Sequence, residues 1–274
     1  MATIAEGPAR PHSRLDVLSG TPRAHAVDRW IFVLMVTWFI AIVLTGFIPD
    51  SLQKIAALQA GVRPAFPLVL HIHAVLMGSF LLLLLGQTWL MATGRRALHM
   101  QLGILVVAVA VALVVAGFFL VPTNYRLMWD AAHSVPPVAI ENFGPSLPEW
   151  ENILLLQTRI GILFSLFLAI GVKARNDNAG LHKRMIILAT AMALGAAIER
   201  ISWLPSTMPM RPLSPDLYTL LAVSPMFACD VVRNRRVHEA YWIWLALWLP
   251  FAVLVNALWD TPWWHAMARQ LLGV

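Results

Sequence analysis

The sequence has few charged residues and a single cysteine, and both shortages exclude classes of protein. Only 12% of the 274 residues are Asp, Glu, Lys or Arg, whereas 59% are hydrophobic. A soluble domain of this length needs many more polar side chains on its surface. Cys229, the one cysteine, cannot form an internal disulfide or a cysteine-based metal cluster. The composition therefore predicts an integral membrane protein.

Several enzyme motifs are also missing from the chain. It has no zinc-protease helix signature, no phosphate-binding glycine loop and no paired histidine boxes of the desaturase kind. No lysine lies well inside an apolar run, which argues against a retinal Schiff-base protein. The apolar runs are continuous, whereas transmembrane β-strands would give short alternating segments. Ionisable residues inside the apolar runs are then the places to look for function.

Long apolar runs predict an all-α fold, a membrane bundle of about seven transmembrane helices. One helix crosses a bilayer with about 20 mostly apolar residues. The expected spans are 30–48, 66–91, 98–121, 152–172, 182–204, 213–231 and 240–258. Residues 1–29 are expected to form a cytoplasmic arm and 30–274 a single transmembrane domain with an outer loop near 122–150. The arm has no apolar core before Trp30, so the first span would act as its own insertion signal.

Basic residues predict the orientation and the membrane. They gather in the N-terminal arm and in three turns, at Arg95 and Arg96, between Lys173 and Arg184, and between Arg233 and Arg236. Positive residues favour the cytoplasmic side. We therefore expect a multi-pass protein of a bacterial cytoplasmic (inner) membrane with its N-terminus in the cytoplasm. This asymmetry accounts for the net charge of +6, so membrane lipid and not nucleic acid is the expected partner.

Ionisable groups from three spans are expected at one depth near the outer side. At about 1.5 Å per residue, His71 and His73 lie roughly 7–10 Å inside the outer end of their span. The other groups at this depth are Gln157 and Arg159 of the fourth span and Glu199 and Arg200 of the fifth. Together these side chains predict an outward-facing polar pocket.

Three interpretations of this pocket are open. In the first, His71 and His73 are metal ligands for iron, copper or zinc. They point about 200° apart on a helix, so each would serve a different neighbour. In the second, Arg159 and Arg200 hold an anionic headgroup or a quinone-like substrate, while a histidine or Glu199 moves a proton. In the third, Glu199 and Arg159 form an ion pair and the histidines are hydrogen-bonded to backbone or water.

A second group of histidines is expected at the cytoplasmic ends of the helices. His99, His182 and His238 stand at three helix starts, and Asp230 stands at the end of the sixth span. Two histidines from different helices could hold one b-type haem, with a carboxylate orienting an imidazole. Alternatively, each histidine lies at the membrane interface and contacts only water or phosphate.

Two segments of the chain resemble known families and each other. The stretch HAVLMGSFLLLLLGQTWLMATGRRALHMQLG resembles bacterial multi-span membrane proteins of largely unassigned function, with a Gly-Arg turn and a Leu-His helix start. The later LHKRMIILAT repeats the Leu-His start. More distantly, the chain is similar to the cytochrome b561 family, whose core histidines hold two haems. That resemblance implies His73, His99 and His182 as axial ligands of b-type haem.

Three functions are consistent with these observations. The first is a membrane redox protein or oxidoreductase that uses a b-type haem or a histidine-ligated iron or copper. The second is a metal-free lipid- or quinone-binding enzyme or a small-solute carrier. The third is an assembly or scaffold subunit in contact with other membrane subunits. For an enzyme, the candidate catalytic residues are Glu199 as proton acceptor and Arg159 and Arg200 as anion-binding groups.

Overall fold

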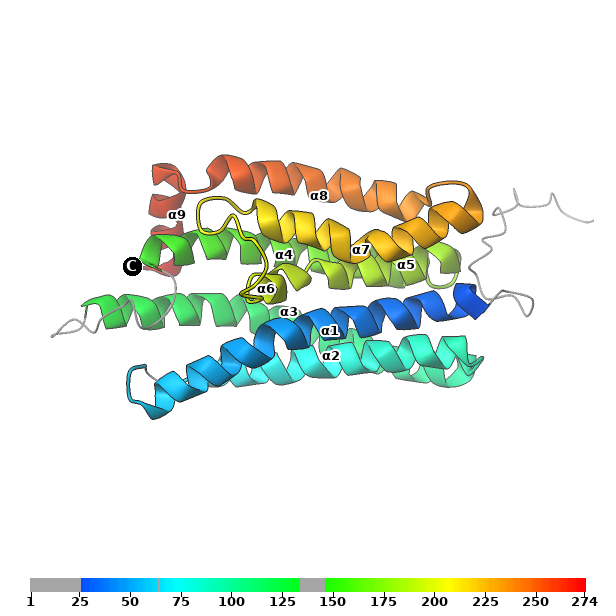
Figure 1. Cartoon of the computed structure of the whole chain (residues 1–274), viewed down its shortest axis with the longest axis horizontal. Coiled ribbons are helices and arrows are strands. Elements are labelled where there is room, and N and C mark those ends of the chain that lie inside the picture. Colours follow the sequence, from blue (N-terminus) through cyan, green and yellow to red (C-terminus); the bar gives the residue numbers. More distant parts are fainter. Residues whose placement is uncertain (1–25, 64, 134–145) are drawn as a thin grey trace, which may run out of the picture.

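The computed structural model describes residues 26–63, 65–133 and 146–274, which form helices and no strand (Figure 1). The helices are α1 (Ala26–Gln59), α2 (Leu68–Ala92), α3 (Arg96–His133), α4 (Leu147–Ala174), α5 (Ala179–Ala191), α6 (Leu194–Ile198), α7 (Leu213–Asn234), α8 (Glu239–Leu258) and α9 (Pro262–Leu272). The prediction of an all-α fold is confirmed. The expected N-terminal arm lies almost entirely outside the described residues.

Among the described residues, seven helical segments are long and apolar enough to cross a membrane, with α5 and α6 together forming the fifth. The chain is a multi-pass membrane protein. Several helices are longer than the predicted spans. The helix α1 continues past Pro49 to Gln59 although its apolar run ends near Ile48. An ion pair one turn apart, between Lys54 and Asp50 at 2.7 Å, supports this extension.

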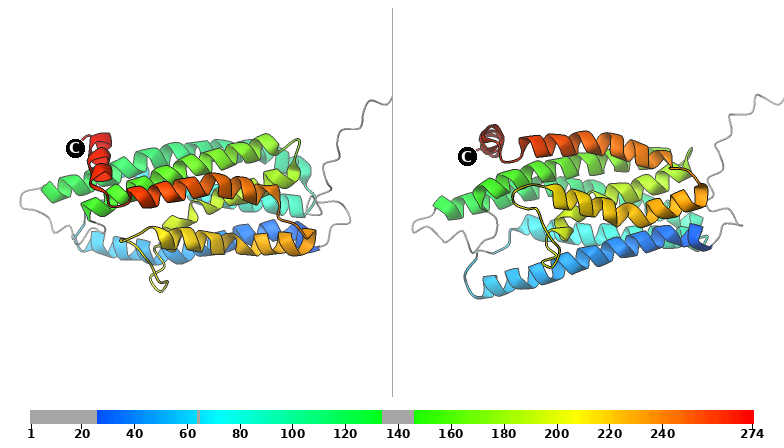
Figure 2. Two further views of the ribbon diagram at one scale, coloured as in Figure 1. Left: turned by 90° about the horizontal axis from the view of Figure 1, so that it is seen from above. Right: turned by 45° about the horizontal axis from the view of Figure 1, so that its top comes forward.

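The two ends of the bundle are formed by different helix ends and turns (Figures 1 and 2). We call one the α9 end, because the short helix α9 lies there across the direction of the other helices. The C-termini of α1 and α8 and the connection between α6 and α7 also lie at this end. The opposite end contains the start of α1 and the turns that join α2 to α3, α4 to α5 and α7 to α8.

The loop predicted near 122–150 is shorter than expected, because its first part is helical. The helix α3 passes through Pro122 and ends at His133, and α4 begins at Leu147. Contacts with distant residues hold this extension in place. Tyr125 donates a hydrogen bond to Glu151, and Arg126 donates to the carbonyl of Leu272. Residues 134–145 lie outside the described part of the chain.

The fifth span lies in the middle of the bundle. The helix α5 contacts α1, α4, α7 and α8, and about two thirds of the apolar window of the fifth span is buried. Its neighbour α6 touches α1 backbone to backbone. A Cβ atom added to Gly46 of α1 would lie 2.0 Å from the carbonyl oxygen of Ala197. Small residues at this crossing therefore set the distance between α1 and α6.

Candidate functional site

A cavity of about 140 Å³ lies between α2, α3 and α4. Its wall is mainly apolar, with His73, Gln157 and Thr158 as its polar side chains; the apolar members include Met77, Leu113, Val114, Gly117, Phe118 and Phe164. The Thr158 hydroxyl donates to the carbonyl of Leu154 at 2.8 Å. A dry apolar cavity of about 150 Å³ holds a benzene molecule. The space is therefore suited to one ring-sized molecule.

His73 gives this cavity its main polar group. The imidazole is half-buried, and its Nδ1 atom is buried without a hydrogen-bond partner among the described residues. Gly117 lies opposite, where an added Cβ would stand 3.6 Å from Cε1 of His73. Most buried polar atoms in proteins have a partner, and an unpaired one costs about 1–3 kcal/mol. His73 thus lines the cavity and has a buried nitrogen atom that no described residue bonds.

His71 points away from the cavity. Its side chain is exposed and stands edge-on to Phe66, with ring centroids 6.0 Å apart. His71 and His73 therefore have different neighbours, as the helical geometry predicts. Across the described ranges, no group of three or more His, Cys, Asp or Glu residues is arranged to hold a metal ion.

Arg159 does not pair with Glu199, so that interpretation is wrong. Its guanidinium forms a double hydrogen bond with Asp216 in the first turn of α7, at 2.6 and 3.0 Å. Arg159 is buried, and the Asp216 side chain is nearly so. This pair joins α4 to α7. The neighbouring residues Thr158 and Ile160 line the cavity but Arg159 does not, so the pair lies on the other side of α4.

Glu199 and Arg200 also contact residues outside the predicted pocket. Glu199 accepts hydrogen bonds from Ser206 at 2.6 Å and from Ser214 at 2.8 Å. Arg200 contacts Asp50 at 3.3 Å and lies over the ring of Phe47. The predicted polar groups are therefore divided among separate contacts, and only His73 and Gln157 face the cavity.

His99 and His182 lie side by side at the opposite end of the bundle. Their ring centroids are 6.5 Å apart and the rings are nearly perpendicular. Nδ1 of His99 contacts the carbonyl of Gln87 at 3.4 Å, and Nδ1 of His182 contacts that of Gly171 at 2.8 Å. A carbonyl only accepts, so Nδ1 is the donor in both contacts, and Nε2 of a ring that is neutral then has a lone pair. The matching contacts give a structural reason for the similar Leu-His segments.

Other residues predicted near these histidines have structural contacts. His238 caps α8 by accepting a hydrogen bond from the backbone N–H of Ala240 at 3.1 Å. Asp230 accepts two hydrogen bonds from Arg184 and one from Tyr241, so no imidazole is among its hydrogen-bond partners. His73 lies beside Gly117, which is about 27 Å along α3 from His99. His73 and His99 therefore cannot ligate the same haem.

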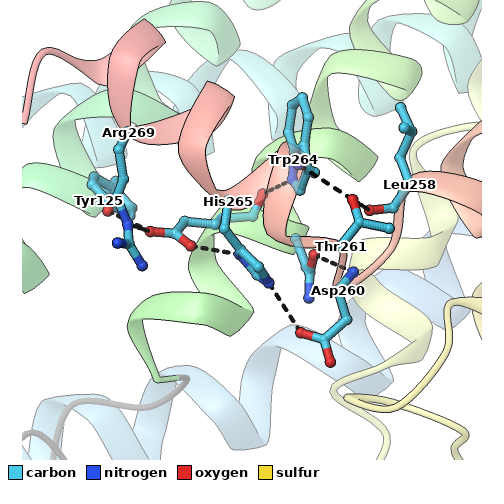
Figure 3. A network of polar contacts seen from close by, with 9 residues as sticks. Tyr125, Leu258, Asp260, Thr261, Trp264, His265 and Arg269 are labelled. Atoms are coloured by element: carbon cyan, nitrogen blue, oxygen red, sulfur yellow. Dashed lines mark hydrogen bonds and ion pairs between the residues drawn. The ribbon is translucent and has the colours of Figure 1, made fainter.

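A network of polar contacts that was not predicted lies at the α9 end, and Figure 3 shows Tyr125, His265 and Arg269 within it. The fully buried carboxylate of Glu151 accepts from Tyr125 at 2.9 Å and from Arg269 at 2.8 Å, and it contacts His265 Nδ1 at 2.6 Å. The other ring nitrogen of His265 lies 3.0 Å from Asp260. The hydrogen bond with Glu151 raises the pKa of the Arg269 guanidinium above its ordinary value. Two carboxylates thus flank one imidazole.

The signal for this network was present in the sequence around 261–272. Thr261 accepts from the backbone N–H of Trp264, and Pro262 occupies the first turn, as at many helix starts. Trp264, Ala268 and Leu272 are spaced four apart and form the buried face of α9. The helix has 11 residues and follows the last predicted span, 240–258, so it is too short to be found as a membrane span.

Replacing His265 with alanine is expected to release α9 from the bundle. The substitution removes both contacts of the ring and leaves the buried Glu151 carboxylate with one fewer partner. Loss of a hydrogen bond to a buried charged group costs about 1.5–3 kcal/mol. Hydrogen exchange of 262–272 should therefore become faster, while the exposed control His133→Ala leaves it unchanged. Equal exchange in both variants would show that the ring does not hold α9.

Comparisons with family models, curated proteins and solved structures found no match to this chain.

Proposed function

We propose that this membrane protein binds a small lipid-soluble molecule of the quinone class in the cavity beside His73. The observation that supports the proposal most directly is the buried Nδ1 atom of His73, which has no hydrogen-bond partner in the described part of the chain and belongs to a side chain that lines a largely apolar cavity. A quinone ring combines flat apolar faces with carbonyl oxygens at its edge. Such a ring would meet apolar side chains on most sides and one hydrogen-bond donor.

Each group of the wall has a role in this proposal. His73 donates its Nδ1–H to one carbonyl oxygen of the ligand. The amide of Gln157 offers a second polar group, and the rings of Phe118 and Phe164 contact the ligand's face. The absence of a side chain at Gly117 leaves room beside the imidazole. Arg159, Glu199 and Arg200 have no part in ligand binding here, because their charged groups contact other residues.

The experiment measures the affinity of short-tailed ubiquinone and menaquinone analogues for the detergent-purified protein. His73→Leu removes the donor and is expected to weaken binding about tenfold or more. Val114→Phe fills the cavity and should weaken it at least as much. The controls are His71→Leu and Val111→Phe, which change exposed residues of the same two helices. Equal affinity in all five proteins would overturn the proposal.

A second candidate function is redox chemistry at His99 and His182, and a specific observation favours it. Both imidazoles have Nδ1 bonded to a carbonyl, which is how metal-bound histidines are commonly oriented. His99 and His182 would hold such a metal through their Nε2 atoms. Their ring centroids are 6.5 Å apart, so the two imidazoles are near neighbours. A bound b-type haem, iron or copper would supply one-electron chemistry.

An absorption spectrum with metal analysis tests this second function. The purified protein should contain iron or copper in stoichiometric amount, and His99→Ala and His182→Ala should each lose it. His133→Ala serves as the control, because His133 lies at the other end of α3. A metal content equal in all variants, or absent from all, would contradict the function. If neither a quinone nor a metal binds, the third function, an assembly or scaffold subunit in contact with other membrane subunits, is favoured.

We further propose that the opposite end faces the cytoplasm of a bacterium and that the α9 end faces outward. The turns at Arg95 and Arg96 and between Arg233 and Arg236 lie at the end where α1 begins, and this arrangement of basic residues supports the proposal. A protease-cleavable tag after Val274 should then be removed from outside by a protease added to spheroplasts. A tag that is protected until the membrane is broken would reverse the orientation.

A further inference from the structure

Two cationic side chains contact one carboxylate near the end of α1, and a third cation, Arg63, interacts with them through its charge. Lys54 and Arg200 both contact the same oxygen of Asp50, at 2.7 and 3.3 Å. The charges of Arg63 and Arg200 act on Lys54, and the charge of Asp50 acts on Arg63. One negative charge therefore faces three positive ones, and the cluster carries a net positive charge.

The two guanidinium groups of this cluster are held over aromatic rings. Arg200 lies 4.7 Å from the ring centroid of Phe47, and Arg63 lies 4.3 Å from that of Phe66. Nε of Arg63 is buried without a hydrogen-bond partner within the described residues. Burial lowers the pKa of the Arg63 guanidinium, and the charge of Asp50 opposes that effect. Cation–π contacts fix the direction of both groups without neutralising them.

Nearby acidic residues do not compensate for this charge. Glu199 precedes Arg200 in the sequence, yet its carboxylate accepts hydrogen bonds from Ser206 and Ser214. Glu151, the buried carboxylate at the same end, is bonded to Arg269, Tyr125 and His265. The side chains of Lys54 and Arg200 remain about one third exposed, at 36% and 34%. An anion can therefore reach them.

We propose that Lys54, Arg63 and Arg200 form a phosphate-binding site at the α9 end of α1. Guanidinium and ammonium groups are the usual partners of phosphate oxygens, and two guanidinium planes add directional donors. Leu52 and Ile55 flank Lys54 on α1 and are exposed, so apolar surface lies beside the cations. A phospholipid headgroup provides phosphate next to acyl chains, and free phosphate provides the same anion alone. The site is separate from the His73 cavity and does not depend on it.

The test compares thermal stability in three conditions. The full-length protein is placed in nanodiscs of phosphatidylcholine, of phosphatidylglycerol, and of phosphatidylcholine with added inorganic phosphate. The variant Lys54→Gln/Arg63→Gln removes two cations and leaves the contact between Arg200 and Asp50. Arg211→Gln is the control, since Arg211 is an exposed basic residue near the start of α7. Binding of phosphatidylglycerol to each protein is measured in parallel by native mass spectrometry.

The wild type and Arg211→Gln are expected to melt at a higher temperature in phosphatidylglycerol than in phosphatidylcholine. The double variant should lose this difference and bind the lipid about tenfold more weakly. Stabilisation by inorganic phosphate alone, lost in the same variant, would assign the site to free phosphate. Should the double variant fail to fold, Lys54→Gln is compared with the charge-conserving Lys54→Arg. Responses that do not differ between the cation-removing variant and the wild type would overturn the proposal.

Discussion

Asp230→Ala is expected to destabilise the protein by about 3–5 kcal/mol, among the largest effects of any single substitution in the chain. Arg184 and Asp230 are both fully buried, with two hydrogen bonds of 2.6 and 2.8 Å between them. The hydroxyl of Tyr241 donates a third hydrogen bond to Asp230 at 2.6 Å. Alanine removes both oxygens that neutralise the guanidinium, in a part of the bundle where water cannot replace them.

The thermal midpoint in detergent and the urea concentration at half-unfolding measure this effect. Asp177→Ala is the control, because Asp177 is an exposed aspartate in the turn between α4 and α5 at the same end. A double replacement, Arg184→Met/Asp230→Leu, is expected to recover part of the stability, since two apolar side chains leave no buried charge. If Asp230→Ala unfolds like the wild type, the pair does not join α5 to α7 as described.

Gly46→Ala is expected to lower the free energy of unfolding by about 3 kcal/mol or more, at the upper end of overpacking effects. The added methyl carbon would lie 2.0 Å from the carbonyl oxygen of Ala197 and 2.8 Å from its carbon. These are backbone atoms, so no side-chain rotation relieves the overlap. The helices α1 and α6 must separate, which loosens the contacts around the middle of the bundle.

Gly78→Ala provides a matched control for this substitution. Gly78 is also within a transmembrane helix, and a Cβ atom there would meet nothing within 4 Å. Alanine favours helix over glycine by roughly 1 kcal/mol, so this control should be neutral or stabilising. The two variants are compared by thermal midpoint in the same detergent. Similar midpoints for both would contradict the close contact between α1 and α6.

The number and helical type of the membrane spans followed from the sequence, whereas their ends, the division of the fifth span into α5 and α6, and the short helix α9 did not. Continuous apolar runs of about 20 residues leave few alternatives to membrane helices. The extension of α3 beyond Pro122 depends on Glu151 and on the carbonyl of Leu272, which lie far along the chain. Hydropathy carries no information about such partners, so the predicted loop began too early.

The candidate site was predicted in part. Counting residues along a helix gives the depth of a side chain but not the direction in which it points around the axis. The relative direction of two residues on one helix does follow from their spacing, so the prediction that His71 and His73 point apart agrees with their different surroundings. Glu199 and Arg200 share a depth with the cavity yet contact other residues. The partner of Arg159 was missed, because rotation of α4 toward Asp216 depends on how the helices pack.

Nitrogen NMR of the protein with ¹⁵N-labelled histidine tests the central claim most directly, because it observes the Nδ1 atom of His73 itself. The His73→Leu spectrum identifies its signal, and a soluble quinone analogue is then added to the wild type. We predict that the Nδ1 resonance of His73 shifts as a hydrogen bond to the ligand forms, while the signals of His71 and His265 stay in place. A saturating ligand that leaves the His73 resonance unmoved would contradict the account.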